Sequence, residues 1–304
     1  MAQAMFVTRI RTVRSISAFF AALALASGVA ASDGVLEINQ ACVATGCFGG
    51  DEADFPVTID APGSYQLTSN LVVTSAVDAI QVRAGRVRID LNGFTIDGSS
   101  TGTIGVSTGG RSNVQGTVVR NGTIRNFTDD GIFITPISVD TRIEGMQVLS
   151  NGGDGVTVDD GSAVVDSGVF GNGGNGVVLP VSTDDARVSG CIIADNGGAG
   201  IQGSGNFSAN VIFSNTGDGV SGRSLVVEHN AIRGNGGDGV EATFSAMLSE
   251  NAIYLNSGYG IRENSANGRK GYARNSINTN TLGTISEIPQ ELEANVCNGN
   301  LNCP

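Results

Sequence analysis

Paired carboxylates and a few arginines are the side chains in this chain that could do chemistry. Asp129-Asp130, Asp159-Asp160 and Asp184-Asp185 are adjacent acids, and such groups can bind Ca²⁺ or share a proton in glycoside hydrolysis. Both tasks need oxygens that converge from different parts of the chain, whereas adjacent residues on a strand point to opposite faces. These acids therefore need a scaffold that brings further ligands to them.

A repeated hexapeptide indicates that scaffold. "NGGDGV" occurs at residues 151–156 and 235–240, and related segments begin at Asn172, Asn196, Asn215, Asn256 and, in degenerate form, Asn280. In every copy the residues three before and five after the first Asn are aliphatic, and the residue eight before it is apolar. The copies follow one another at intervals of 19 to 24 residues, a period typical of stacked coils.

The residue types between these apolar anchors favour a parallel β-helix with three short strands per coil. A leucine-rich repeat would need leucines at fixed offsets and a helical segment, whereas the anchors here are Val and Ile and the linking residues are Gly, Asn, Ser and Asp. Stacked coils would place equivalent strands about 4.8 Å apart. We expect Gly and Asn to supply positive φ angles in the recurring turn and stacked Asn side chains to bond to one another. A second Asn column, five residues before the first, supports the register at Asn210, Asn230, Asn251 and Asn275.

These columns, together with "VRIDLNGFTIDG" at residues 87–98, resemble the right-handed parallel β-helix proteins of the pectin-lyase-like superfamily. The resemblance extends from about residue 72 to 285 and implies an all-β solenoid of about 8–10 coils with capped ends. It leaves the activity open, because the superfamily includes pectate lyases, polygalacturonases, mannuronan epimerases, phage tailspikes and secreted proteins without known chemistry. The Gly-His-Gly and Arg-Ile-Lys of polygalacturonases and the Asp-Pro-His of alginate epimerases are absent, and the one histidine, His229, lies in "EHN". The absence of these motifs does not exclude the looser pattern of pectate lyases, which consists of acidic calcium ligands and an arginine base.

Such proteins hold their substrate groove on the strand that follows the repeat turn. If the residue five after the repeat Asn points inward, the residues six and eight after it point outward. These outward residues include Asp159, Gln202, Arg223, Glu241 and Arg262, which therefore share one face. We predict Arg223 and Arg262 as candidate catalytic bases and Gln202 as a substrate-binding residue, and the resemblance implies Ca²⁺ as the cofactor of such a reaction. The candidate calcium ligands are Asp159, Asp160 and Glu241. The alternative for Glu241 and Arg262 is a surface ion pair that stabilises the fold by well under about 1 kcal/mol.

Aromatic residues give a weaker indication of a sugar-binding surface. The chain has no Trp and four Tyr. Tyr254 and Tyr259, beside Tyr272 on a late coil, could stack against a sugar or could fill and cap the end of the helix. We include Tyr254 and Tyr259 among the candidate substrate-binding residues.

The ends of the chain indicate export and capping. Residues 1–31 have a basic start, a short apolar core and a small-residue cleavage signal at Val29-Ala30-Ala31, which predicts a signal peptide and a secreted or periplasmic protein. Removal of this segment leaves 14 basic against 29 acidic residues, a net charge of −15, which argues against binding nucleic acid. No later stretch is apolar enough to span a membrane.

The cysteines lie in two local pairs at opposite ends of the chain, Cys42 with Cys47 and Cys297 with Cys303. In an exported protein we interpret each pair as a disulfide rather than as half of a metal site. Cys191 is left inside the repeat, where we expect a small buried side chain. One pair belongs to an N-terminal cap at residues 32–71, which precedes the coils at 72–285. The other belongs to a C-terminal cap at 286–304. We expect the segment "ISEIPQELEANVC", which leads into this second cysteine pair, to form a short helix.

Three functions follow from these features. We favour a secreted β-helix that serves as a carbohydrate-binding, surface or adhesion scaffold without a complete catalytic set, monomeric rather than oligomeric, with polysaccharide as the expected partner. The alternative is a calcium-dependent uronate lyase or epimerase, which would use Asp159 or Glu241 as metal ligand and Arg223 or Arg262 as base. A tailspike-like fibre is the third, but a signal peptide and disulfides point away from a phage origin.

Overall fold

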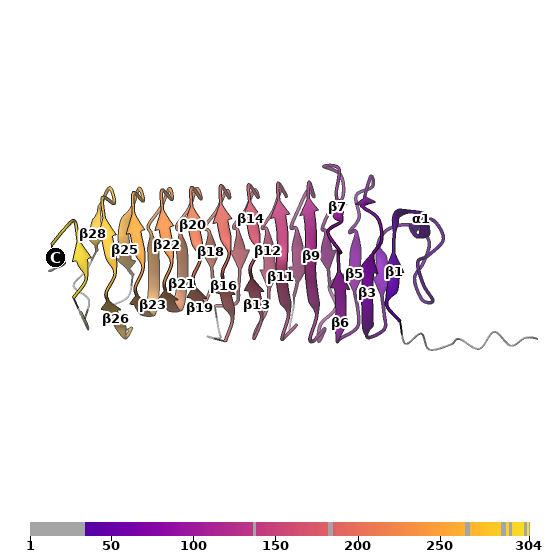
Figure 1. The fold of residues 1–304 in the computed structure, drawn as a ribbon, viewed down its shortest axis with the longest axis horizontal. Coiled ribbons are helices and arrows are strands. Elements are labelled where there is room, and N and C mark those ends of the chain that lie inside the picture. The colour runs from indigo at the N-terminus through magenta and orange to yellow at the C-terminus, as the bar shows by residue number, and fades with distance from the viewer. Residues whose placement is uncertain are drawn as a thin grey trace, which may run out of the picture. The chain divides into compact units, whose positions relative to one another are not determined.

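The computed structural model describes residues 34–135, 138–181, 185–264, 268–286, 290–291, 294–300 and 303. The predicted signal peptide and Asp184 lie outside these residues. The described chain folds into short parallel strands that stack coil upon coil (Figure 1). This arrangement confirms the predicted all-β parallel solenoid.

Each coil contributes strands to three parallel sheets, which we name a, b and c in chain order. Sheet a begins the coil, and it consists of β1 (Leu36–Ile38), β3 (Gly63–Leu67), β6 (Val87–Asp90), β9 (Val118–Arg125), β11 (Arg142–Leu149), β13 (Ala163–Val165), β16 (Arg187–Ser189), β19 (Gly205–Ser208), β21 (Val220–Glu228), β23 (Val240–Ser249), β26 (Lys270–Ala273) and β29 (Gln290–Glu291). The longer strands β9 and β11 continue into sheet b, and the first halves of β21 and β23 belong to sheet c.

The other two sheets follow the same coil order. Sheet b also contains β4 (Leu71–Val72), β7 (Thr95–Asp97), β14 (Gly168–Phe170), β17 (Ile192–Ala194), β20 (Val211–Phe213), β22 (Ala231–Arg233), β24 (Ala252–Tyr254), β27 (Ser276–Asn278) and β30 (Val296–Cys297). Sheet c also contains β2 (Val57–Ile59), β5 (Ile80–Val82), β8 (Val106–Ser107), β10 (Ile132–Ile134), β12 (Val156–Val158), β15 (Val177–Val178), β18 (Ile201–Gln202), β25 (Tyr259–Glu263) and β28 (Gly283–Ile285).

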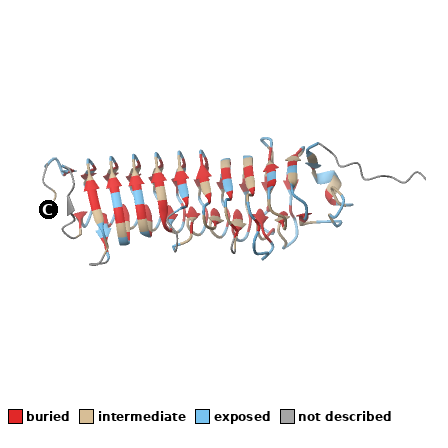
Figure 2. Ribbon diagram, turned by 90° about the horizontal axis from the view of Figure 1, so that it is seen from below, coloured by how far each residue is buried: buried red, intermediate tan, exposed pale blue. Residues whose placement is uncertain are grey.

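The core runs along the inside of the solenoid as columns of aliphatic side chains. The anchors predicted three residues before the repeat Asn, from Val148 to Ile277, are fully buried, and those five residues after it are buried from Val156 to Ile285. Buried and exposed residues alternate along the strands (Figure 2). Because β-branched side chains stack well against their copies on neighbouring coils, this repetition supplies the burial that holds the coils together.

Two Asn ladders join the coils at their corners, as predicted. Between sheets b and c, the Nδ2 of Asn215 donates to Oδ1 of Asn235 at 3.0 Å, and Asn235 donates in turn to Asn256 at 2.9 Å. Between sheets a and b, Asn210, Asn230, Asn251, Asn275 and Asn295 form the same chain of bonds. Each acceptor oxygen also takes a backbone N–H of the preceding coil, as Asn235 does from Asn215 at 3.1 Å. The ladders therefore satisfy polar groups that the stacking buries.

The glycines of the repeat have a different role from the one expected. The residue with positive φ in each corner precedes the Asn, as at Ser214 and Leu255, while Gly236 and Gly239 are outside that region. A Cβ on Gly236 would lie 2.2 Å from the Thr216 carbonyl oxygen, and one on Gly239 would lie 2.4 Å from the Ile253 side chain. Glycine recurs there because adjacent coils approach too closely to admit a side chain.

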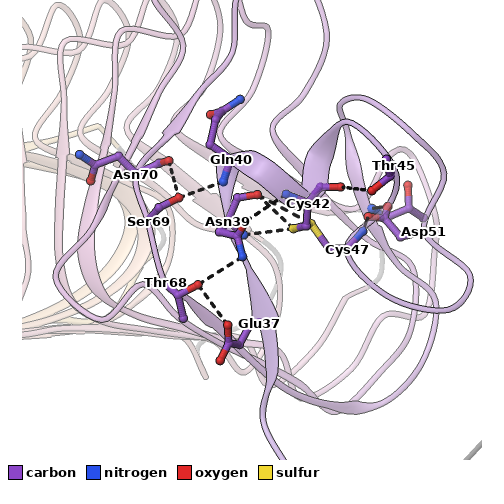
Figure 3. Close-up of a disulfide and its surroundings, with 11 residues drawn as sticks. Glu37, Asn39, Gln40, Cys42, Thr45, Cys47, Asp51, Thr68, Ser69 and Asn70 are labelled. Carbon is purple, nitrogen blue, oxygen red and sulfur yellow. Dashed lines mark hydrogen bonds between the residues drawn. A yellow bond between two sulfur atoms is a disulfide. The ribbon is translucent and has the colours of Figure 1, made fainter.

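The two predicted disulfides are present, and they lie at the two ends of the described chain. Cys42–Cys47 joins the short helix α1 (Gln40–Val43) to the loop that follows it (Figure 3), and Cys297–Cys303 closes the C-terminal segment. Cys191 is buried and unpaired, as expected. The short helix expected in the C-terminal segment is wrong for the part that the structure describes, where β29 and β30 add strands to sheets a and b instead.

Candidate functional site

The outer face of sheet c carries one outward side chain per coil in a continuous row. Strand register aligns Thr157, Val178, Gln202, Ser221, Glu241 and Arg262 in that order. Their neighbours along each strand, such as Ile201 and Val220, point inward and are fully buried. Strand alternation thus places these residues on one face, as predicted.

Several of these side chains bond to one another across coils. The Nδ2 of Asn175 donates to Oε1 of Gln202 at 3.1 Å, and Oγ of Ser221 donates to Oε2 of Glu241 at 2.8 Å. Asn264 also donates its amide to Oε1 of Glu241. The face is therefore a surface of amide, hydroxyl and carboxylate groups held in register by the strands beneath it.

A column of acidic turn residues borders this row. Oδ1 of Asp130 accepts the Asp154 N–H at 2.7 Å, and Oδ1 of Asp218 accepts the Asp238 N–H at 2.6 Å. Burial raises the pKa of Asp130 to about 6. Burial, followed by the negative charges of Glu241 and Asp238, likewise raises the pKa of Asp218 to about 6. The column gives this side of the molecule a negative character above that pH.

Arg262 has a different partner from the one predicted. Its guanidinium lies 3.5 Å from a carboxylate oxygen of Asp238, and Glu241 is not its ion-pair partner. The two oxygens of Glu241 instead accept hydrogen bonds from Ser221 and Asn264. The Asp238 pair includes an exposed arginine, so its contribution to stability is small.

Arg223 and Gln202 line one shallow groove. The groove has a volume of about 290 Å³ and is formed with Val181, Ser221, Gly222 and Thr243, where sheet c turns into sheet a. The Arg223 guanidinium stacks over the Phe244 ring at 5.1 Å, a contact that holds a cation at the edge of the groove. Two of the predicted site residues are thus brought together.

The three candidate calcium ligands do not form one site. Asp159 and Asp160 follow β12, whereas Glu241 lies on β23, and β15, β18 and β21 separate them. Four strand spacings amount to about 19 Å, too far for one ion to bridge. Within the described ranges, no three His, Cys, Asp or Glu side chains are grouped so that they could hold a metal ion.

The tyrosines do not form a common stacking site. Tyr254 points outward from β24 in sheet b, whereas Tyr259 begins β25 in sheet c. Tyr272 is fully buried inside the last coils. Tyr272 therefore packs inside the solenoid, which was the alternative to sugar stacking. Tyr254 and Tyr259 lie on different faces because the corner at Asn256 separates their strands.

One polar group inside the solenoid was missed from the sequence. Glu263, seven residues after the repeat residue Asn256, points inward. Its carboxylate accepts a hydrogen bond from Lys270 at 2.7 Å and another from the Tyr272 hydroxyl at 2.6 Å. The Lys270 and Glu263 side chains are only 5% and 7% exposed, and burial, followed by the bond to Glu263, raises the pKa of Tyr272. The sequence feature that could have revealed this network is a charged residue at a strand position that the repeat turns inward. Being enclosed, this network does not belong to the outer face.

Comparison with known proteins defines the family. A model described as right handed beta helix region matches residues 57–208 and, again, 130–282. The chain belongs to the right-handed β-helix family. A search of curated protein sequences finds no match to this β-helix protein.

Solved β-helix structures share the fold at low sequence identity. The Azotobacter vinelandii mannuronan C-5 epimerase AlgE6 A-module is 16% identical with a TM-score of 0.58, and the alignment covers 84% of each chain. The periplasmic alginate epimerase AlgG is 13% identical with a TM-score of 0.53, covering 76% of this β-helix and 66% of AlgG. The Dettilon tailspike protein is 10% identical with a TM-score of 0.55, covering 79% and 54%. These similarities show a common fold and leave the chemistry to the side chains.

Proposed function

We propose that this protein is exported and binds polysaccharide along the outer face of sheet c, without catalysing a reaction. The observation that carries the proposal is the row of amide, hydroxyl and carboxylate groups from Asn175 to Asn264, linked across coils by hydrogen bonds. These groups both donate and accept, as binding to sugar hydroxyls requires. The fixed spacing of about 4.8 Å between strands suits a polymer that repeats its contacts from one sugar to the next.

The charge of the face favours an uncharged polymer. Asp218 lies within interaction range of both Asp238 and Glu241, and Arg262 is engaged by Asp238. A uronate polymer would be repelled by these carboxylates unless a cation bridged them. The similar epimerases, whose names refer to mannuronan and alginate, support a polysaccharide as ligand, while the side chains here point to a different one.

The arrangement of the arginines argues against catalysis. Arg223 on β21 lies three coils from Asp159, about 14 Å at the strand spacing. A lyase or epimerase needs its base and its charge-stabilising group around one sugar. Arg262 is the other candidate base, and its guanidinium is engaged by Asp238 at 3.5 Å.

Affinity electrophoresis in gels that contain uncharged polysaccharides tests this proposal. We expect at least one polymer to retard the mature protein. We expect Gln202→Ala with Ser221→Ala to weaken binding about tenfold or more, because two hydrogen bonds of about 1 kcal/mol each are lost. Gln66→Ala, which removes an amide from sheet a, is the matched control and should bind normally. If no polymer retards the protein, or if the double variant binds as the control does, the proposal is wrong.

The same panel separates binding from catalysis. Pectate and alginate are incubated with the protein, with and without Ca²⁺, while the ultraviolet absorbance of unsaturated uronate is followed and proton NMR checks for epimerised residues. We expect neither product. Calcium-dependent product that disappears in Arg223→Ala would establish the lyase or epimerase alternative instead.

A further inference from the structure

A second row of outward side chains lies on sheet b, and it is aromatic on alternate coils. The register of β14, β17, β20, β22 and β24 aligns Phe170, Ala194, Phe213, Arg233 and Tyr254 in that order. Ala194, between the two phenylalanines, is fully buried. The three aromatic side chains are half-buried, so part of each ring is open to solvent. Of the three, only Tyr254 is a predicted site residue, although all three stand two residues before a repeat Asn.

The first of these rings lies across its own strand. A Cβ on Gly168 would come within 2.4 Å of the Phe170 ring, so the ring covers Gly168. Further along the row, the Arg233 guanidinium lies over the Phe213 ring at 4.5 Å. Arg233 thus occupies the coil between two aromatic side chains and stacks on one of them.

The spacing of the aromatic side chains matches a sugar polymer. Phe170 and Phe213 are two coils apart, as are Phe213 and Tyr254, and two strand spacings amount to about 10 Å. That distance is comparable with the disaccharide unit of a β-1,4-linked chain, in which alternate sugars present the same face. The apolar C–H face of a pyranose packs well against an aromatic ring.

The width and charge of this surface also favour a single glycan chain. On these five strands the other outward positions are Gly168, Ile192, Val211, Ala231 and Ala252, so Arg233 is their one outward charge. Each strand has three residues, which makes the strip about 10 Å wide and about 20 Å long. Roughly 200 Å² is far below the 800 Å² or so that each partner buries in a stable protein interface. A second copy of the chain is therefore a poor occupant for the strip.

We propose that the strip formed by Phe170, Phe213 and Tyr254 binds an uncharged β-1,4-linked polysaccharide chain that runs parallel to the solenoid axis. The strip lies on sheet b, away from the polar row of sheet c. This proposal therefore does not depend on the function proposed for that row, and either one can fail alone.

Isothermal titration calorimetry with cellohexaose and with mannohexaose tests the strip. We expect the mature protein to bind at least one of them and Phe170→Ala with Phe213→Ala to weaken that binding tenfold or more. Gly168→Ala, which leaves both rings in the chain but displaces the Phe170 ring, should weaken it several-fold. Tyr254→Phe keeps an aromatic ring and should bind as the wild type does. Far-ultraviolet circular dichroism and the urea unfolding midpoint establish that each variant is folded.

Two controls decide how the results are interpreted. Gln66→Ala alters sheet a, outside both proposed surfaces, and should leave oligosaccharide binding unchanged. If neither oligosaccharide binds, or if the Phe170→Ala, Phe213→Ala variant binds normally, the strip is not a glycan site. Sedimentation equilibrium is the second control: a wild-type dimer that this variant dissociates would make the strip a self-association surface and overturn the proposal.

Discussion

At the scale of single residues, the acidic turn column combines a structural bond with an unfavourable charge. Asp218 accepts the Asp238 N–H, while burial and the neighbouring carboxylates raise its pKa to about 6. Asn175 stands in the same column and accepts the Ala199 N–H at 2.8 Å without a charge. The bond therefore needs the oxygen but not the ionised group.

Asp218→Asn should change how stability depends on pH. Between about pH 4 and pH 6 the native protein keeps a proton on Asp218 that the unfolded chain releases, so wild-type stability falls as the pH rises through this window. The variant lacks that loss, and we expect it to be more stable at pH 7 by on the order of 1 kcal/mol, allowing for partial exposure. Urea unfolding at pH 4, 5.5 and 7 measures this, with the exposed Asp195→Asn as control. Parallel pH profiles for wild type and Asp218→Asn would contradict it.

At the scale of elements, the Asn ladders are what let the strands turn between sheets. Each corner buries backbone N–H groups that no strand can pair, and the ladder supplies their acceptors. Asn235 is fully buried and takes part in bonds to both the preceding and the following coil. A single ladder residue thus satisfies partners on two neighbouring coils.

Asn235→Ala should destabilise the protein by about 2–4 kcal/mol. It leaves the backbone N–H of Asn215 without an acceptor, removes one of the two acceptors of the Asn215 amide, and removes the side-chain donor to Oδ1 of Asn256, all of them buried. Asn278→Ala, which removes an amide bonded at the surface to Ser276, should cost less than about 0.5 kcal/mol. The free energy of unfolding in urea compares the two, and equal losses would show that the ladder has no special role.

At the scale of the whole molecule, a solenoid must cover the strand edges at its ends. In the first coil, Oε1 of Gln40 accepts the Val72 N–H at 2.6 Å, and Oδ1 of Asp51 accepts the Thr58 N–H at 2.7 Å. These side chains come from α1 and from the loop after Cys47, and the disulfide holds that segment together (Figure 3). The cap thus supplies acceptors to backbone N–H groups at the edges of β4 and β2, which could otherwise pair with another chain.

Removing these two side chains should therefore promote association. We expect Gln40→Ala with Asp51→Ala to form larger particles with rising protein concentration, as measured by multi-angle light scattering. Glu52→Ala, an exposed acid beside Asp51, should stay as the wild type. A double variant with the wild-type mass at every concentration would show that other parts of the cap protect the edge. The described residues contain no helix suited to crossing a membrane.

The sequence alone determined the repeat architecture of this protein. Burial of the Val and Ile columns and both Asn ladders follow from periodic spacing, because each coil must place the same residue type at the same point. The two disulfides follow from the local pairing of cysteines at the two ends of the chain. The outward face of sheet c followed from strand alternation in the same way. Glu263 departs from the inward pattern, and its partners Lys270 and Tyr272 could not be inferred because they lie on the next strand of another sheet.

Only the tertiary structure decided which outward side chains meet. It paired Arg262 with Asp238 instead of Glu241, and it bonded the two oxygens of Glu241 to Ser221 and Asn264. Coil position fixes the face on which a side chain lies. Its partner depends on rotamers and competing hydrogen bonds, which the repeat does not encode.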